Sequence, residues 1–135
     1  SQLSNLKRIL SNKNKIYKFY IQLFKNIKGI NIKKLEYNKN IFCNKWLTIV
    51  IINKNEFPFK SKNYFLNYLK TNNIEARPIW KPMHQQPIFK KSIFFNNNNS
   101  DLLYKSAIAL PSGAGITKTE LTFIKKVFNK ILVIL

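Results

Sequence analysis

The sequence predicts a small domain of the α/β or α+β class, with a long N-terminal helix, a short sheet and helices that cover it. Three observations support this class: a helical spacing of apolar residues over positions 1–28, an apolar run at 46–52, and strand-like segments alternating with helix-like segments thereafter. The 135 residues suit one domain, and the hydrophobic fraction of 45% is ample for a packed core.

Residues 1–28 are expected to form one long helix that Gly29 ends. The apolar stripe recurs every three or four residues, and Lys13 is its only polar member. Its apolar members are Leu3, Leu6, Leu10, Tyr17, Tyr20, Phe24 and Ile27. At ~1.5 Å per residue this helix would be about 40 Å long, more than a domain of this size needs. It is therefore either an amphipathic core helix or a helix built to lie along something larger.

The run from Trp46 to Ile52 predicts a strand that is central in the sheet, because it is apolar on both faces. Ser61 can cap a second helix over residues 62–71. The inward side of this helix is predicted to hold Phe65, Leu66 and Leu69. A further strand is expected from Ile74 to Ile79, where it enters a proline-rich segment.

Four consecutive asparagines at 96–99 predict the tip of a loop. A short helix over residues 101–106 and a strand over residues 107–110 should follow. Thr117 and Glu120 have the spacing of a capping box that opens the last helix. The core-facing residues of that helix are predicted to be Leu121, Ile124, Phe128 and Ile131.

The chain carries a formal net charge of +19, from 24 basic and 5 acidic residues. Lysine accounts for 22 of the basic residues and arginine for only 2, while asparagine and isoleucine occur 19 times each. Lys, Asn and Ile have the codons richest in A and T, so the composition indicates codon bias. Arginine is the residue that contacts phosphate and guanine in a bidentate manner, and its scarcity disfavours nucleic-acid binding. A stand-alone basic nucleic-acid-binding module remains the alternative function.

Few residues in the sequence are candidates for a disulfide, for catalysis or for metal binding. The single cysteine, Cys43, excludes an intramolecular disulfide and indicates a reducing compartment, hence the cytoplasm; we expect it to be a small core or edge residue. The single histidine is His84, and the five acids are scattered without metal-ligand spacing. No apolar stretch approaches the ~20 residues of a membrane helix, and no signal peptide is visible.

The turn from Ser112 to Gly115, between a strand and a helix, has two interpretations. Its glycines would let backbone amides approach a phosphate. It lacks the third glycine of a dinucleotide fingerprint and the Lys-Ser/Thr of a P-loop, so a turn that feeds a capped helix is favoured.

The segment 75–87 concentrates the rare residue types of the chain. Within eight positions it places Arg77, Trp80, Lys81, Met83 and His84. Prolines stiffen this path, so Arg77 and Lys81 could bind a phosphate or carboxylate, Trp80 could stack on a ring, and His84 could exchange hydrogen bonds. The alternative is a buried crossover in which Trp80 belongs to the core and Arg77 caps a carbonyl.

Residues 74–87, IEARPIWKPMHQQP, closely resemble the GIE-x-RP-x-WKPMH-x-QP motif of the DegT/DnrJ/StrS family of nucleotide-sugar aminotransferases. Residues 108–113, IALPSG, together with Thr117 and Glu120, are similar to the closing LPSG…LT-x-x-E region of that family. The opening SQL of the long helix and the Trp46-Leu47 pair are also similar to the family's AQL helix and WL strand. The resemblance covers essentially the whole chain.

The resemblance implies the C-terminal small domain of a pyridoxal-phosphate (PLP) enzyme of the aspartate-aminotransferase fold type. Such enzymes transfer an amino group, usually from glutamate, to a nucleotide-linked keto sugar, and the WKPMH form resembles the branch acting on UDP-linked 4-keto-6-deoxy amino sugars. By this resemblance Arg77, Trp80, Lys81 and His84 lie on a loop facing the active site or the partner of a homodimer. Ser112 and Gly113 are expected to shape a turn.

The resemblance also implies what this chain lacks. The family's large domain, with the Schiff-base lysine and the phosphate cup, would precede Ser1, and no lysine here can be nominated as catalytic. Met83 is the only methionine, which fits a longer protein. We therefore expect residues 1–29 to be an interdomain helix, residues 30–135 to be the small domain, and the chain alone to be inactive. A non-catalytic remnant or scaffold is the further alternative.

One residue of the motif region departs from the family. Asn73 stands where the family often has glycine, and asparagine tolerates the left-handed conformation that glycine favours.

Overall fold

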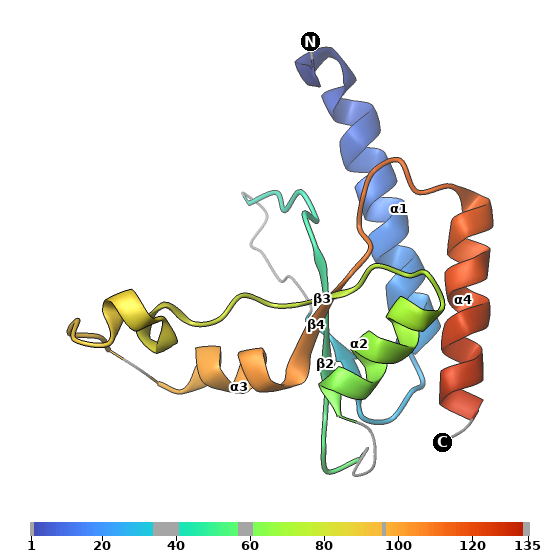
Figure 1. Cartoon of the computed structure of the whole chain (residues 1–135). Helices are drawn as coiled ribbons and strands as arrows, with labels where there is room; N and C mark the ends of the chain where they lie inside the picture. Colours follow the sequence, from blue (N-terminus) through green and yellow to red (C-terminus); the bar gives the residue numbers. More distant parts are fainter. Residues whose placement is uncertain (1, 34–40, 57–60, 96, 134–135) are drawn as a thin grey trace.

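The computed structural model describes residues 2–33, 41–56, 61–95 and 97–133, and its centre is an antiparallel sheet of four strands (Figure 1). The strand order is β1-β2-β4-β3, and each neighbouring pair is antiparallel. This arrangement is the α+β form of the two that the sequence predicts. The strands are β1 (Ile30–Ile32), β2 (Thr48–Ile52), β3 (Arg77–Pro78) and β4 (Ala107–Leu110).

Helices α1, α2 and α4 lie on one side of the sheet, and α3 projects on the other side together with two 3₁₀ turns formed by residues 83–89 (Figure 1). The described α-helices are α1 (Leu6–Phe24), α2 (Lys62–Thr71), α3 (Asn99–Ser106) and α4 (Lys118–Val133). The described 3₁₀ turns are η1 (Gln2–Asn5), η2 (Met83–Gln85) and η3 (Pro87–Phe89). No helix in the described ranges is long and apolar enough to cross a membrane.

One hydrophobic cluster joins α1, α2 and α4 to the sheet. Tyr20, Phe65 and Phe128 are among its largest fully buried side chains, and the ring of Phe128 meets that of Phe24 edge-on at 5.0 Å. The predicted inward residues of α2 and α4 all belong to this cluster or pack against it. The core therefore follows the helical periodicity of the sequence.

Helix α1 is shorter than predicted, and its apolar stripe divides into two parts. Regular α-helix begins at Leu6 after η1 and ends at Phe24, and Gly29 adopts the left-handed φ of 79° shortly before β1. In the second half of the stripe Tyr20 and Phe24 are buried, whereas Leu3 and Leu6 are 78% and 44% exposed. The first turns of the chain thus present apolar side chains to solvent.

Strand β2 is central, as predicted, but it begins at Thr48 and not at Trp46. Lys45 adopts a positive φ of 52°, and the Asn44 side chain accepts a hydrogen bond from the Trp46 N–H at 3.0 Å. Such an Asx turn redirects the backbone before the ladder starts. Trp46 therefore stands outside the sheet and is 62% exposed.

Two further element boundaries differ from the prediction. Strand β3 covers two residues and not the predicted 74–79, because the Ile74 N–H still bonds the Leu69 carbonyl at 2.9 Å in the turn that ends α2. Asn73 holds the left-handed φ of 56° expected where the family has glycine. Helix α3 begins at Asn99, so the loop predicted over residues 96–99 ends at Asn98, and Asn96 lies outside the described residues.

Both predicted helix caps are confirmed. The Ser61 side chain accepts a hydrogen bond from the Tyr64 N–H, and α2 covers the predicted residues. At α4 the Glu120 carboxylate accepts from the Thr117 N–H at 2.7 Å, while the Thr117 hydroxyl accepts from the Glu120 N–H at 3.2 Å. These bonds satisfy amides that the first helical turn leaves unpaired.

The α4 cap is expected to make stability pH-dependent. Hydrogen bonds from Thr117 lower the pKa of the Glu120 carboxyl below its ordinary value of 4.5. The stabilisation should be fully present above that ordinary value and be lost as the pH falls through the lowered pKa. Urea unfolding of the wild type and Glu120→Gln at a series of pH values should show a wild-type advantage near neutrality that disappears in acid. A pH-independent difference would contradict this assignment.

Candidate functional site

Of the four predicted site residues, Arg77 lies in β3, and the other three lie on the segment that runs from β3 through η2. Arg77 pairs with Ala109 of β4 in the sheet, and its guanidinium bonds the Glu75 carboxylate through Nε, at 3.0 Å, and through Nη2. Both side chains are about three-quarters exposed, so the pair contributes little to stability. The buried-crossover interpretation predicted that Arg77 would cap a backbone carbonyl. The guanidinium bonds a carboxylate instead.

Trp80 is 67% exposed, so it does not belong to the core. Its indole stacks on that of Trp46, with ring centroids 5.7 Å apart and planes 26° apart. Lys81 is exposed, and its carbonyl accepts a hydrogen bond from the Gln86 side chain at 3.3 Å. The structure therefore favours the interpretation in which this segment presents Trp80 and Lys81 outward.

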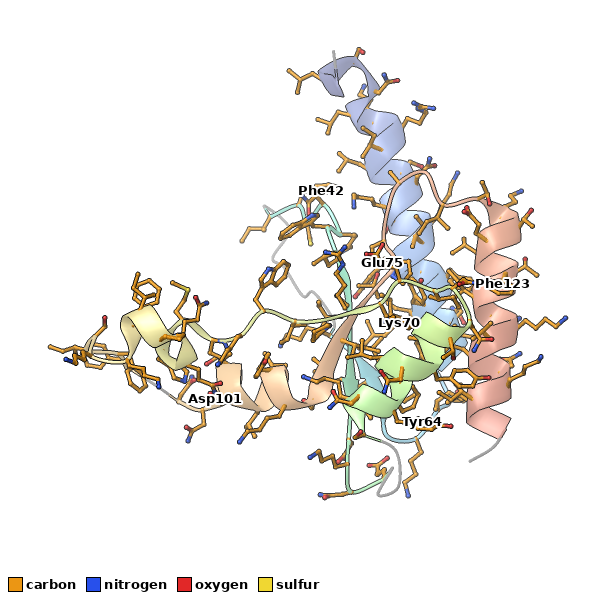
Figure 2. The ribbon with its side chains drawn as sticks, in the orientation of Figure 1. Phe42, Tyr64, Lys70, Glu75, Asp101 and Phe123 are labelled. Carbon is orange, nitrogen blue, oxygen red and sulfur yellow. The ribbon has the colours of Figure 1, made fainter. Side chains whose placement is uncertain are left out.

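His84 differs from the other three because its side chain is largely buried. Its Nε2 lies 3.0 Å from an Asp101 carboxylate oxygen, and both side chains are more than four-fifths buried. The ring stacks on Phe94 at 4.6 Å, and the Gln85 side chain donates to the same carboxylate. Figure 2 shows Asp101 on α3 beside the η2–η3 segment. His84 therefore joins this segment to α3.

Replacing His84 with alanine is expected to loosen η2 without unfolding the sheet. The Gln85 and Gln86 amides bond the Pro82 and Met83 carbonyls at 3.0 and 2.9 Å, so they report on this turn. Loss of the carboxylate contact should speed hydrogen exchange at these amides about tenfold, while the β2 and β4 amides keep their rates. Ile88→Ala is the control, because Ile88 is 80% exposed. Unchanged exchange in His84→Ala would show that the contact does not hold the turn.

The turn after β4 is held by side chains of α1. The carbonyls of Pro111, Ser112 and Ala114 accept hydrogen bonds, at 3.0–3.2 Å, from Tyr20, Lys13 and Asn12 respectively. The Lys13 ammonium also donates to the Trp46 carbonyl at 3.0 Å. Burial lowers the pKa of Lys13 and raises that of Tyr20. Lys13, the polar exception in the apolar stripe, thus connects α1 to two loops.

The same contacts favour the structural interpretation of the Ser112–Gly115 turn. The Ser112 hydroxyl accepts from the Thr48 N–H at 2.9 Å and donates its proton to the Leu110 carbonyl at 2.8 Å, so its bonds go to the backbone of this domain. A Cβ added at Gly113 or Gly115 would meet nothing within 4 Å, so no neighbouring group of this chain requires a glycine at either position. The Ser112 hydroxyl thus joins this turn to the start of β2, which agrees with the turn-shaping role that the resemblance implies for Ser112.

A cavity of about 520 Å³ lies between α1 and the segment that leads to Trp46. Its lining is mainly apolar and includes Leu10, Ile41, Phe42 and Cys43, with Lys45 at the end next to Trp46. Cys43 is half-buried and is not part of the core, so of the two predicted positions, core or edge, the core is wrong. Within the described ranges no group of three or more His, Cys, Asp or Glu side chains could hold a metal ion.

The contact partners of His84 and Trp80 could not be predicted from the sequence. Asp101 lies 17 residues after His84, so local spacing could not pair them. Trp46 belongs by composition to an apolar strand, although the preceding Asn44 is a signal for the turn that excludes it from the ladder. The structure brings His84 to Asp101 and Trp80 to Trp46, whereas Arg77 binds Glu75 close in sequence.

Comparison with known proteins identifies the family to which this chain is similar. The model of the DegT/DnrJ/EryC1/StrS aminotransferase family matches residues 1–131. EpsN of Bacillus subtilis (strain 168), whose name describes a pyridoxal phosphate-dependent aminotransferase, is 30% identical over 124 residues. That alignment covers 89% of this chain and 30% of EpsN.

Solved structures of low sequence identity share the fold. The aminotransferase TlmJ of Streptoalloteichus hindustanus superposes with a TM-score of 0.83 at 10% identity, over 98% of this chain and 34% of TlmJ. The E. coli GDP-4-keto-6-deoxy-D-mannose-3-dehydratase, solved with bound hydrated PLP, gives 0.75 at 18% identity, over 93% and 32%. The chain thus spans about a third of the length of these relatives. From the match over residues 1–131, the chain belongs to the DegT/DnrJ/EryC1/StrS aminotransferase family.

Proposed function

We propose that this chain is the C-terminal small domain of a PLP-dependent aminotransferase that transfers an amino group, from glutamate, to a nucleotide-linked keto sugar. The narrower form of the proposal is a UDP-linked 4-keto-6-deoxy amino sugar. The observation that carries it is the family match over residues 1–131 together with the outward presentation of the WKPMH segment. The proposal includes a cytoplasmic homodimer as the working enzyme.

The proposal assigns no PLP site to the described residues. Such a site needs a lysine free for a Schiff base, an acid for the pyridine nitrogen and a phosphate cradle. Burial lowers the pKa of Lys13 and Lys62, but the first binds two carbonyls and the second donates to the Tyr104 carbonyl. Neither ammonium is paired with a carboxylate in the described contacts. The proposal therefore assigns the cofactor to a large domain outside this chain.

The exposed start of α1 supports an interdomain role for residues 1–29. Leu3 and Leu6 are exposed apolar residues at the end of the helix that projects beyond the sheet (Figure 1). Burying them would remove apolar surface from water, which favours association. In the proposed enzyme this face packs against the large domain, while residues 30–135 form the small domain.

Within that arrangement the chain contributes binding and positioning, and no chemical step is assigned to it. Arg77 and Lys81 provide positive charge on an exposed loop, and Trp80 provides an aromatic face. His84 is a positioning residue, because its ring is held between Asp101 and Phe94.

The test compares the 135-residue chain with the longest product of its gene. After addition of PLP, only the longer product should develop the Schiff-base absorbance at roughly 420 nm and lose it with glutamate. A stable Schiff-base band from the 135-residue chain alone would contradict the assignment of the cofactor to another domain. Failure of the longer product to aminate any nucleotide-linked keto sugar would overturn the proposed activity.

A further inference from the structure

A cavity of about 380 Å³ lies between the turn that follows α2 and the first turns of α4. Its apolar walls include Ile74 and Ile124, which belong to the core, and Phe123, which is 48% exposed. Figure 2 shows Phe123 on the side of α4 that faces the segment after α2. A cavity of this size, with a partly open aromatic ring in its wall, suits the apolar part of a small molecule.

The charge of this cavity is opposite to that of the chain. Glu75 and Glu120 both line it, and the described residues that line it include no lysine, arginine or histidine. The chain as a whole has 24 basic and 5 acidic residues, so this lining runs against the bias toward lysine. Repulsion by lysines elsewhere on the surface is screened beyond about 8 Å at physiological salt. The cavity therefore suits a positively charged occupant.

Each of the two carboxylates keeps one oxygen for such an occupant. In the part of the chain that the structure describes, Glu75 bonds Arg77 through Oε1, and Glu120 bonds Thr117 through Oε2. The second oxygen of each carboxylate accepts no bond in those contacts. Arg77 reaches Glu75 from an adjoining cavity of about 460 Å³, which it lines, and it does not line the smaller one. Hydrogen bonds from Thr117 lower the pKa of Glu120, so this carboxylate is charged at neutral pH.

The donor set of this cavity does not suit a metal ion. Mg²⁺ and Ca²⁺ take about six or more oxygen ligands, and in the described ranges no group of three or more His, Cys, Asp or Glu side chains could hold a metal. An ammonium group needs fewer partners, and it forms charge-assisted hydrogen bonds with a single carboxylate. Two carboxylates beside apolar walls therefore match a molecule that has two ammonium groups and an alkyl chain.

We propose that this cavity binds an aliphatic diamine, with one ammonium group on the Glu75 carboxylate, the other on the Glu120 carboxylate, and the methylene chain against Phe123. Burial of the methylene chain removes apolar surface from water, while exposed ion pairs are individually weak, so the expected Kd is millimolar. The inference concerns a ligand of this domain that takes no part in amino transfer, and it goes beyond the proposed function. A lysine-rich segment of another protein would use the same carboxylates, and the experiment separates the two ligands.

The test is an NMR titration of the isotope-labelled 135-residue chain with putrescine, cadaverine and hexamethylenediamine at constant ionic strength. We expect saturable shifts of the Asn73, Glu75, Glu120 and Phe123 amides, and unshifted amides in β1. Hexylamine has only one ammonium group, so it should bind at least about threefold more weakly than the best diamine. Magnesium chloride and hexamethylene glycol should not shift these amides. Equal shifts from magnesium chloride, or no saturable shift with any diamine, would overturn the proposal.

Three variants assign the contacts. Glu75→Gln and Glu120→Gln should each raise the Kd of the best diamine roughly 2- to 5-fold, the range of one exposed ion pair, and bring it near that of hexylamine. Glu75→Gln leaves the cap of α4 intact, so it measures the contact even if Glu120→Gln loosens that helix. Glu56→Gln is the matched control, because Glu56 is an exposed acid that does not line the cavity, and its Kd should equal that of the wild type. Wild-type affinity in Glu75→Gln would show the proposal to be wrong.

Oligolysine separates a diamine from a basic protein partner. Binding of oligolysine that is tighter than that of every diamine, and that is lost in Glu75→Gln, would overturn the diamine in favour of a basic segment of another protein. Weaker binding of oligolysine than of the best diamine supports the small ligand. The titration involves no turnover, so its result is independent of the amino-transfer assay.

Discussion

Replacing Phe128 with alanine is expected to lower the free energy of unfolding of the 135-residue chain by about 3–5 kcal/mol, the largest effect of any change considered for this chain. Phe128 is 1% exposed on α4, and its ring meets that of Phe24 of α1. The substitution would remove the ring and leave a cavity where α4 meets α1, in a core that cannot fully collapse around it. Urea unfolding followed by far-UV circular dichroism measures the change.

Phe123→Ala is the matched control for that experiment. Phe123 lies on the same helix, and Figure 2 shows it on α4. It is 48% exposed, so its truncation should cost clearly less than that of Phe128. Equal losses from the two substitutions would mean that α4 does not pack through the face that the structure assigns.

Replacing Lys13 with methionine is expected to lower the free energy of unfolding by about 1–3 kcal/mol. The Lys13 ammonium donates to the Ser112 and Trp46 carbonyls, both at 3.0 Å, and so joins α1 to the turn after β4 and to the segment before β2. Methionine keeps an apolar stem of similar length but cannot donate a hydrogen bond. The two carbonyls would lose a charge-assisted bond, and the two loops would lose a common attachment.

Lys15→Met controls for the change in charge, because it removes one lysine from the exposed side of the same helix. We expect its free energy of unfolding to stay within about 0.5 kcal/mol of the wild type. Tryptophan emission provides a second measurement: Lys13→Met should alter it through Trp46, and Lys15→Met should not. Equal behaviour of the two variants would show that Lys13 acts only through its charge.

The parts of the fold that could be predicted are those controlled by neighbours in sequence. Ser61 and the Thr117–Glu120 pair cap α2 and α4 because a cap involves residues only three positions apart. The same holds for the core faces of these helices, where side chains three or four positions apart share one side. Asn73 takes the left-handed conformation that its motif implies.

The parts that could not be predicted depend on partners distant in sequence. Strand β1 has only three residues, and its ladder comes entirely from pairing with β2, for example Ile30 with Ile52. The apolar stripe of α1 gives no sign of where the domain beneath it ends, so Leu3 and Tyr20 look alike in sequence although only Tyr20 is buried. Burial is a property of the assembled layers and not of one helix.

The sequence by itself determined the mixed helix–sheet class, the caps, the second and fourth helices, and a motif specific enough to indicate the family, because each depends on local spacing or on an unbroken run of residues. Only the tertiary structure decided which partners His84 and Trp80 contact. It turned His84 toward Asp101 and stacked Trp80 on Trp46. Contacts between segments far apart in the chain arise when the sheet and its helices pack, and spacing along the sequence contains no measure of that distance.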